Sequence, residues 1–208
     1  MPDLPPLTLI PFIDVIGTFV FAISGTQTAI DKKLDPFGAS VIAFATALGG
    51  GTMRDLLLNL RPVWIQEELL LVTVFVAVMV TLFFRKQIGR FRRTLFLFDT
   101  MGIALFTVLG MEKALRLDVP PLIALVMGVV SAVFGGVVRD ILCNEIPLIF
   151  RREVYATACL AGGASYLFMR LAPVPVGVPV WIAVGIIILI RLLAVRLKWA
   201  FPTLTPKE

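Results

Sequence analysis

The hydrophobic pattern divides the chain into seven long apolar segments separated by short polar loops. Each segment is close in length to the ~20 residues with which an α-helix crosses the ~30 Å hydrocarbon core of a bilayer. The sequence therefore predicts an all-α integral membrane protein with seven transmembrane helices. These segments span residues 9–30, 37–59, 67–84, 95–115, 120–143, 154–171 and 179–197.

An internal repeat relates the first half of the chain to the second. When the sequence is shifted by 85 positions without a gap, residues 12–62 match residues 97–147 at 16 of 51 positions. Because each repeat holds three predicted spans, an odd number, the second copy must enter the membrane upside down relative to the first. We therefore expect a single transmembrane domain over residues 1–208, built from two inverted three-helix repeats and a seventh helix. The repeats cover residues 9–84 and 95–171, and the seventh helix covers 179–197.

A glycine-rich motif marks the second span of each repeat. It reads Gly-Gly-Gly-Thr-Met-Arg-Asp over residues 49–55 and Gly-Gly-Val-Val-Arg-Asp over residues 135–140. Each glycine costs up to ~1 kcal/mol relative to Ala inside a helix, so we expect both helices to break there and to turn carbonyl groups toward a pathway. The alternative is that the glycines only let two helices pack closely. The glycines concerned are Gly49, Gly50, Gly51, Gly135 and Gly136.

Four charged residues follow these glycines, namely Arg54, Asp55, Arg139 and Asp140. Each would cost ~2.5–3.5 kcal/mol at the centre of a lipid-facing helix, so each must pair or meet water. Adjacent residues on a helix point about 100° apart. We therefore expect their partners to come from across the pseudo-two-fold axis or from the helices that carry Asp14 and Asp99. A purely structural role as ion pairs that lock the repeats together is the alternative, and for Asp14 a helix cap is a further one.

The same two helices carry further candidate residues. The hydroxyls of Thr46, Thr52 and Ser131 are candidate donors to the water shell of a passing ion, although bonding back to the helix is the commoner role of such groups. Two Asn-x-x-Pro sequences predict where the helices stop, because Asn favours caps and Pro cannot continue a helix. These helix stops are Asn59 and Pro62 in the first repeat, and Asn144 and Pro147 in the second.

Composition narrows the possible functions. The chain is 59% hydrophobic with a mean hydropathy of +0.97, as expected for a membrane protein. It contains no His, which excludes imidazole catalysis and His metal sites. The polar cluster offers carboxylates and guanidiniums but no nucleophile with a base, so we expect neither an enzyme nor a bound cofactor or metal.

The net charge of +5 comes from loops and does not predict nucleic-acid binding. With the N-terminus outside, twelve basic residues fall on the cytoplasmic side and four on the outer side. The positive-inside rule therefore predicts an outer N-terminus and a cytoplasmic C-terminus. Basic loops also suit anionic lipid headgroups, although topology alone accounts for them. The cytoplasmic set is Lys32, Lys33, Arg85, Lys86, Arg90, Arg92, Arg93, Arg151, Arg152, Arg196, Lys198 and Lys207, and the outer set is Arg61, Lys113, Arg116 and Arg170.

The two motifs, the seven spans and the three-plus-three-plus-one plan resemble prokaryotic trimeric intracellular cation channels over nearly the whole chain. The resemblance implies a homotrimer in the cell inner membrane, with a potassium- and sodium-conducting pore in each protomer. That pore would be lined by the second and fifth helices with help from the first and fourth. The glycines of both motifs would be the bends, and the Arg-Asp pairs the polar cluster around the pore.

A repeat pair with broken helices is equally the layout of a secondary transporter, and closely similar bacterial proteins have been assigned glycine uptake. A channel needs a continuous wet path with weak ion sites. A transporter instead needs one site that never opens to both sides at once. The sequence leaves open whether the chain is a cation channel or a transporter of a small solute such as glycine.

Overall fold

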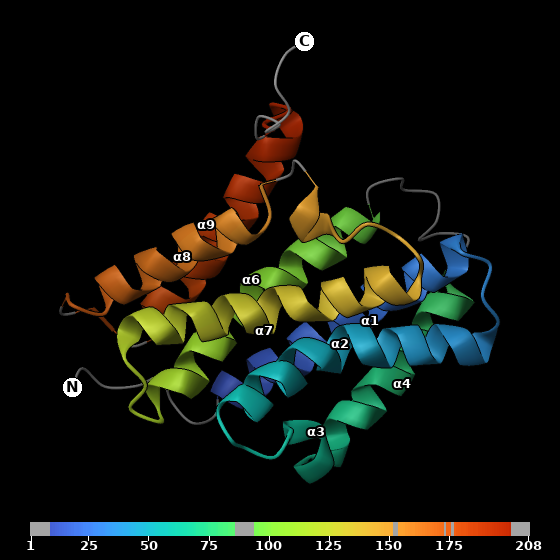
Figure 1. Ribbon diagram of the computed structural model, residues 1–208, viewed down its shortest axis with the longest axis horizontal. Helices are drawn as coiled ribbons and strands as arrows, with labels where there is room; N and C mark the ends of the chain where they lie inside the picture. The colour runs from blue at the N-terminus through green and yellow to red at the C-terminus, as the bar shows by residue number, and fades with distance from the viewer. Residues whose placement is uncertain (1–8, 86–93, 152–153, 173, 176, 201–208) are drawn as a thin grey trace.

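The computed structural model describes residues 9–85, 94–151, 154–172, 174–175 and 177–200 (Figure 1). Every regular element in these ranges is helical, which confirms the predicted all-α class for the described part of the chain. The elements are α1 (Leu9–Asp31), α2 (Pro36–Leu57), α3 (Val63–Gln66), α4 (Glu68–Phe83), α6 (Thr94–Leu115), α7 (Pro121–Leu142), the 3-10 helix η1 (Leu148–Phe150), α8 (Ala156–Met169) and α9 (Val178–Arg196).

Five of the described helices are long and apolar enough to cross a membrane, namely α1, α2, α6, α7 and α9. The helices α4 and α8 are apolar but shorter. The count of seven spans therefore stays a prediction, whereas the multi-pass membrane class is supported by the five long helices.

The orientation in the membrane also stays a prediction. Six of the loop cations on which it depends, Lys86, Arg90, Arg92, Arg93, Arg152 and Lys207, lie outside the described residues. Lys113, which we assigned to the outer side, belongs to the last turn of α6.

The helices α2 and α7 begin and end in the same way. Pro36 and Pro121 are their first residues, where the missing amide proton costs no helical hydrogen bond. Just beyond their C-caps, Asn59 and Asn144 adopt left-handed conformations with φ of 57° and 53°. The amide after each Asn donates to the carbonyl of the motif's Asp at 2.8 Å, which completes a Schellman turn.

The helices α2 and α7 pack against each other (Figure 1), and the glycine motifs lie in this contact. Gly50 faces the carbonyl of Ser131 and Gly135 faces the carbonyl of Thr46, so the two helices run antiparallel. A Cβ atom on either glycine would collide with the facing backbone. Both helices continue through their motifs, so the predicted break is wrong. The glycines instead let the two backbones approach closely.

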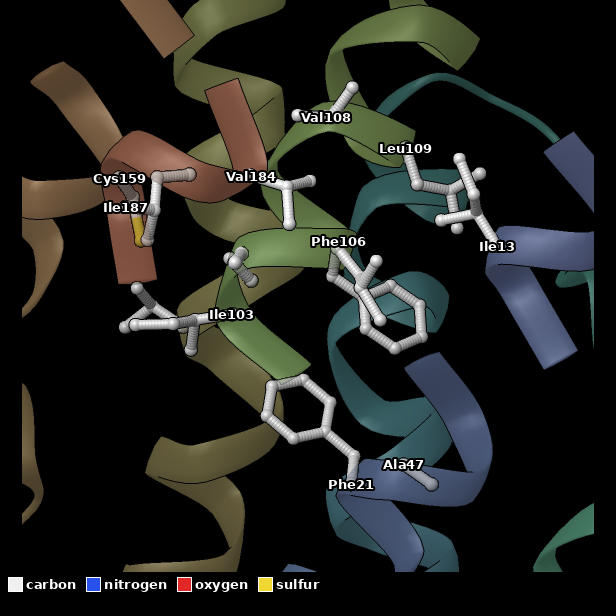
Figure 2. Packing of buried hydrophobic residues seen from close by; sticks show 14 of the residues in the cluster. Ile13, Phe21, Ala47, Ile103, Phe106, Val108, Leu109, Cys159, Val184 and Ile187 are labelled. Atoms are coloured by element: carbon white, nitrogen blue, oxygen red, sulfur yellow. The ribbon is translucent and has the colours of Figure 1, made fainter. Parts of the chain in front are cut away.

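A second antiparallel pair, α1 and α6, lies beside the first. The rings of Phe21 and Phe106 stack with centroids 5.3 Å apart and planes 9° apart (Figure 2). Each ring covers a glycine of the other helix, since Gly17 faces Phe106 and Gly102 faces Phe21. The two phenylalanines and the two glycines are each 85 positions apart in the sequence. These two contacts between the repeats are therefore equivalent to each other.

The remaining helices flank these four. α4 packs on α1 and α2, and α8 packs on α7 and α6. α9 lies against α6 and α8, where Ile187 of α9 meets the core beside Cys159 of α8 (Figure 2). The helices α1, α2 and α4 thus correspond in order to α6, α7 and α8, and α9 has no counterpart among the described elements.

Candidate functional site

Two buried polar clusters lie on opposite sides of the α2–α7 crossing. Each motif arginine follows its contact glycine by four residues, and the helices run antiparallel, so the two arginines lie on opposite sides of the crossing. We call these groups the Arg54 cluster and the Arg139 cluster. The first contains Asp14, Arg54, Asp55, Lys113 and Ser131, and the second contains Ser24, Asp99, Arg139, Asp140, Tyr155 and Arg191.

In the Arg54 cluster a single guanidinium joins α2 to α7. Arg54 is 1% exposed and donates to Oδ1 of Asp55 from Nε at 2.8 Å and from Nη2 at 2.6 Å. Its Nη1 donates to the hydroxyl of Ser131 at 3.2 Å. The other carboxylate oxygen of Asp55 accepts the amide of Val63 at 3.1 Å. The Arg-Asp pair therefore also fixes the start of α3.

In the Arg139 cluster the equivalent guanidinium holds three helices together. Its Nε donates to Oδ1 of Asp140 at 2.8 Å, and its Nη1 donates to Oδ1 of Asp99 and to the hydroxyl of Ser24, both at 2.8 Å. The second oxygen of Asp140 accepts the amide of Leu148 at 3.0 Å. Arg139 therefore connects α7 to α1 and α6, and Asp140 fixes η1 as Asp55 fixes α3.

Asp99 is fully buried and has two further neighbours that sequence analysis did not assign to the site. The hydroxyl of Tyr155 donates to its Oδ1 at 3.4 Å, and Nη2 of Arg191 lies 3.8 Å from its Oδ2. The Arg191 guanidinium also lies 4.8 Å from the ring centroids of Phe96 and Tyr155. The signal for Arg191 was present in the sequence, because it is a charged residue in the interior of the apolar seventh segment, whereas Arg196 lies at the end of that segment.

Asp14 has a different partner from its repeat equivalent. Nζ of Lys113 donates to its Oδ2 at 3.0 Å, whereas Asp99 is held by Arg139. Asp14 is the sixth residue of α1 and is buried, so it does not cap the first helical turn. This pair was not predicted, because Lys113 was assigned to an outer loop, whereas it lies in the last turn of α6.

The structure shows which groups bond to the motif arginines and to the hydroxyl of Thr46. We expected the motif arginines to find partners on other helices, and this is confirmed by the contact of Arg139 with Asp99 and of Arg54 with Ser131. The expectation that the adjacent aspartates are not partners is wrong, because Arg54 also bonds Asp55 and Arg139 also bonds Asp140. The arginine side chain is long enough to turn back to the next residue of its own helix. The hydroxyl of Thr46 donates to the carbonyl of Ile42 at 2.6 Å, the common helical arrangement.

A small pocket lies beside Arg54. Its volume is about 10 Å³, which is room for about one water, and its lining includes Asp14, Gly51 and Thr52. A larger surface pocket of about 380 Å³ shares Asp55 and Val63 with it. Asp55 and Val63, near the C-terminal end of α2, therefore border both pockets.

The charges within each cluster balance. The Arg54 cluster holds two cations and two carboxylates, and so does the Arg139 cluster. This pairing offsets the desolvation cost of burying the charges between helices. No group of three or more potential metal-ligating side chains occurs in the described part of the chain.

A family model, protein sequences and solved structures each match most of this chain. The family model described as "Glycine transporter" matches residues 11–86 and 96–170. The UPF0126 inner membrane protein YadS of Escherichia coli K12 is 40% identical over 207 residues, covering 96% of this chain and 98% of that protein. The structure of the TRIC trimeric intracellular cation channel orthologue from Rhodobacter sphaeroides matches with a TM-score of 0.87 and 33% identity, covering 92% of this chain and 99% of that one.

A further TRIC cation channel structure matches with a TM-score of 0.83 and 34% identity. This match covers 95% of the present chain and 98% of that chain. These similarities extend over both halves of the sequence and over the whole helical arrangement. The chain therefore belongs to the family that includes the UPF0126 membrane proteins and the trimeric intracellular cation channels.

Proposed function

We propose that the protein is a channel for monovalent cations, potassium and sodium, with one path through each protomer. The observation that carries this proposal is the pair of buried Arg-Asp sites on either side of the α2–α7 crossing, one of which contains Asp55, a residue that also lines a surface pocket. The family relatives described as cation channels support it.

The proposed path runs from the larger pocket past Asp55 into the small pocket, then past the Gly50–Gly135 crossing to the Arg139 cluster. Carboxylates on this path attract cations, and the guanidinium beside each carboxylate keeps the attraction weak. Weak sites suit conduction because an ion must leave as readily as it enters. Since the small pocket has room for about one water, we infer that the structure represents a closed conformation. Opening then requires Arg54 to move away from Ser131.

The assembly that we propose is a homotrimer in the cell membrane, with the N-terminus outside and the C-terminus in the cytoplasm. The trimer is supported by the description of the Rhodobacter sphaeroides relative. The orientation is supported by the excess of basic residues in the loops on one side. Membrane lipids would surround the exposed apolar faces of the helices.

Single-channel recording of the purified protein in planar bilayers with a potassium chloride gradient tests the proposal. We expect unitary currents that reverse near the potassium equilibrium potential. Asp55→Asn should reduce cation conductance because it removes a negative charge from the junction of the two pockets, while the amide oxygen still accepts the Val63 hydrogen bond. Asp118→Asn is the matched control, because Asp118 is exposed with a φ of 57° that Asn also adopts readily.

The recording tests whether Asp55 lies on the path and whether the protein is a channel or a transporter. Equal conductance in Asp55→Asn and Asp118→Asn would remove Asp55 from the path. Absence of any current from well-reconstituted protein, combined with saturable glycine uptake into the same vesicles, would replace the channel by a transporter.

A secondary transporter of a small solute such as glycine is the second candidate. It is favoured by the small pocket beside Arg54, because a transporter passes through states in which its binding site is closed. A buried guanidinium and buried carboxylates in one cluster also suit the two opposite charges of an amino acid. The description of the matching family model is consistent with this candidate. Saturable uptake without unitary currents would identify it.

A further inference from the structure

A third pocket lies at the C-terminal end of α9, outside the proposed path, and we call it the α9 pocket. It has a volume of about 430 Å³. Three cationic side chains line it, Arg151, Arg191 and Lys198, together with the indole of Trp199 and the aliphatic side chain of Val195. Its described lining contains no carboxylate. The composition is that of a site for an anionic group with an apolar attachment.

The basic residue at the base of this pocket is fixed in place. Arg191 is 1% exposed, and its Nη1 donates to the carbonyl of Val154 at 3.1 Å. Its guanidinium is also stacked against two aromatic rings, as described above. A held guanidinium loses little conformational freedom on binding, and arginine is well suited to phosphate oxygens.

The rim of the pocket remains positive when its neighbours are counted. Nη2 of Arg151 lies 3.2 Å from Glu145, which also pairs with Lys32. The hydrogen bond and charge of Lys32 lower the pKa of Glu145, so this carboxylate is ionised at neutral pH. Lys32, Arg151 and Lys198 thus bring three positive charges against one negative charge. An anionic ligand would reduce this excess.

The apolar side of the pocket indicates where the ligand comes from. Trp199 is about half exposed, and tryptophan is enriched at the interface between membrane and water. Val195 and Leu192 are exposed on α9 just before it, so an apolar surface leads from the pocket along a membrane-spanning helix. Basic pockets between membrane helices recognise acidic lipid headgroups in this arrangement.

We propose that the α9 pocket binds the phosphate group of an anionic phospholipid, with Arg151, Arg191 and Lys198 around the headgroup and an acyl chain along α9. A free phosphate ion would meet the same cations but would leave Trp199 and the aliphatic surface unused. This proposal concerns binding alone and is independent of the solute that the protein moves.

The test compares lipid binding by the purified, delipidated protein and by two variants. The probes are dioctanoyl phosphatidylglycerol, dioctanoyl phosphatidylcholine and inorganic phosphate, and binding is followed by native mass spectrometry and by thermal stabilisation. The test variant is Arg151→Gln with Lys198→Asn, because both residues are exposed and Asn accepts the left-handed φ of 54° at position 198. Arg191 is left unchanged because it also pairs with Asp99.

The control variant is Arg196→Gln, since Arg196 is an exposed cation at the same helix end but does not line the pocket. We expect phosphatidylglycerol to bind the unaltered protein and the control alike, and the double variant to lose affinity by about tenfold or more, as loss of charged hydrogen bonds to phosphate implies. Equal binding of phosphatidylcholine would overturn the charge argument. Inorganic phosphate binding as tightly as the lipid would overturn the lipid assignment. An equal loss of phosphatidylglycerol affinity in Arg196→Gln would show that diffuse surface charge, rather than the α9 pocket, attracts the lipid.

Discussion

At the scale of single residues, the two repeats use the same arginine and aspartate with different supporting partners. Arg139 holds two carboxylates and a hydroxyl, whereas Arg54 holds one carboxylate and a hydroxyl. Both guanidiniums are almost fully buried, so removing either leaves a buried carboxylate with a lost partner. The loss of folding stability should be larger for the arginine that pairs with more carboxylates.

We therefore expect Arg139→Ala to destabilise the protein by ~3–5 kcal/mol, the range for breaking a buried ion pair from one side. Arg54→Ala should destabilise it less, because it leaves only Asp55 without its partner. The measurement is the temperature at which half of the purified protein is lost from its gel-filtration peak after heating. Arg196→Ala is the control on the exposed end of α9, and a loss for Arg139→Ala no larger than for this control would contradict the prediction.

The sequence identified the charged residues of the site but not all of their partners. The motif arginines and aspartates were visible as charges inside apolar segments that repeat at a fixed offset. The Asp14–Lys113 pair could not be recognised in the sequence, because it joins the start of one helix to the end of another and has no equivalent in the second repeat. Such pairs depend on the packing of helices, which no local pattern specifies.

At the scale of helices, the glycines explain how α2 and α7 come together. Within the triplet only Gly50 faces the opposing backbone closely. An added Cβ at Gly49 would have its nearest neighbour at 3.7 Å, and one at Gly51 at 3.6 Å, which are ordinary contact distances. Three adjacent glycines therefore have different structural roles, and substitution separates them.

Gly50→Ala should destabilise the protein by ~1–3 kcal/mol, because the new methyl group forces α2 and α7 apart. Gly49→Ala and Gly51→Ala should be neutral or stabilising by up to ~1 kcal/mol, because Ala favours the helix. The same heated gel-filtration measurement checks this series. Three equal effects would show that helix propensity, rather than the close approach of the two backbones, explains the glycines.

The positions of the helices could be predicted from the sequence, whereas the role of the glycines could not. The predicted segment 37–59 is close to α2, Pro36–Leu57, and the predicted segment 67–84 is close to α4, Glu68–Phe83. A glycine run inside an apolar segment is compatible with a broken helix and with a close helix contact. Only the position of the facing helix distinguishes the two, and here it favours the contact.

At the scale of the whole molecule, the arrangement follows from two antiparallel helix pairs with equivalent contacts. The repeat in the sequence indicated which helices correspond. It did not indicate where α9 lies, because α9 has no equivalent in the repeat, so the contact of Arg191 with Asp99 became visible only in the structure. The central claim is that the space beside the α2–α7 crossing becomes the ion path.

The most direct test of that claim places a cysteine in the small pocket and modifies it during single-channel recording. Thr52→Cys, in a Cys143→Ser, Cys159→Ser background, puts a thiol on the pocket lining. Met79→Cys, about half exposed on α4, is the control outside the proposed path. A positively charged methanethiosulfonate reagent should lower the unitary potassium current of Thr52→Cys permanently and leave Met79→Cys unchanged. Unaltered Thr52→Cys currents with reagent on both sides of the membrane, or an equal fall in Met79→Cys, would contradict a path at the crossing.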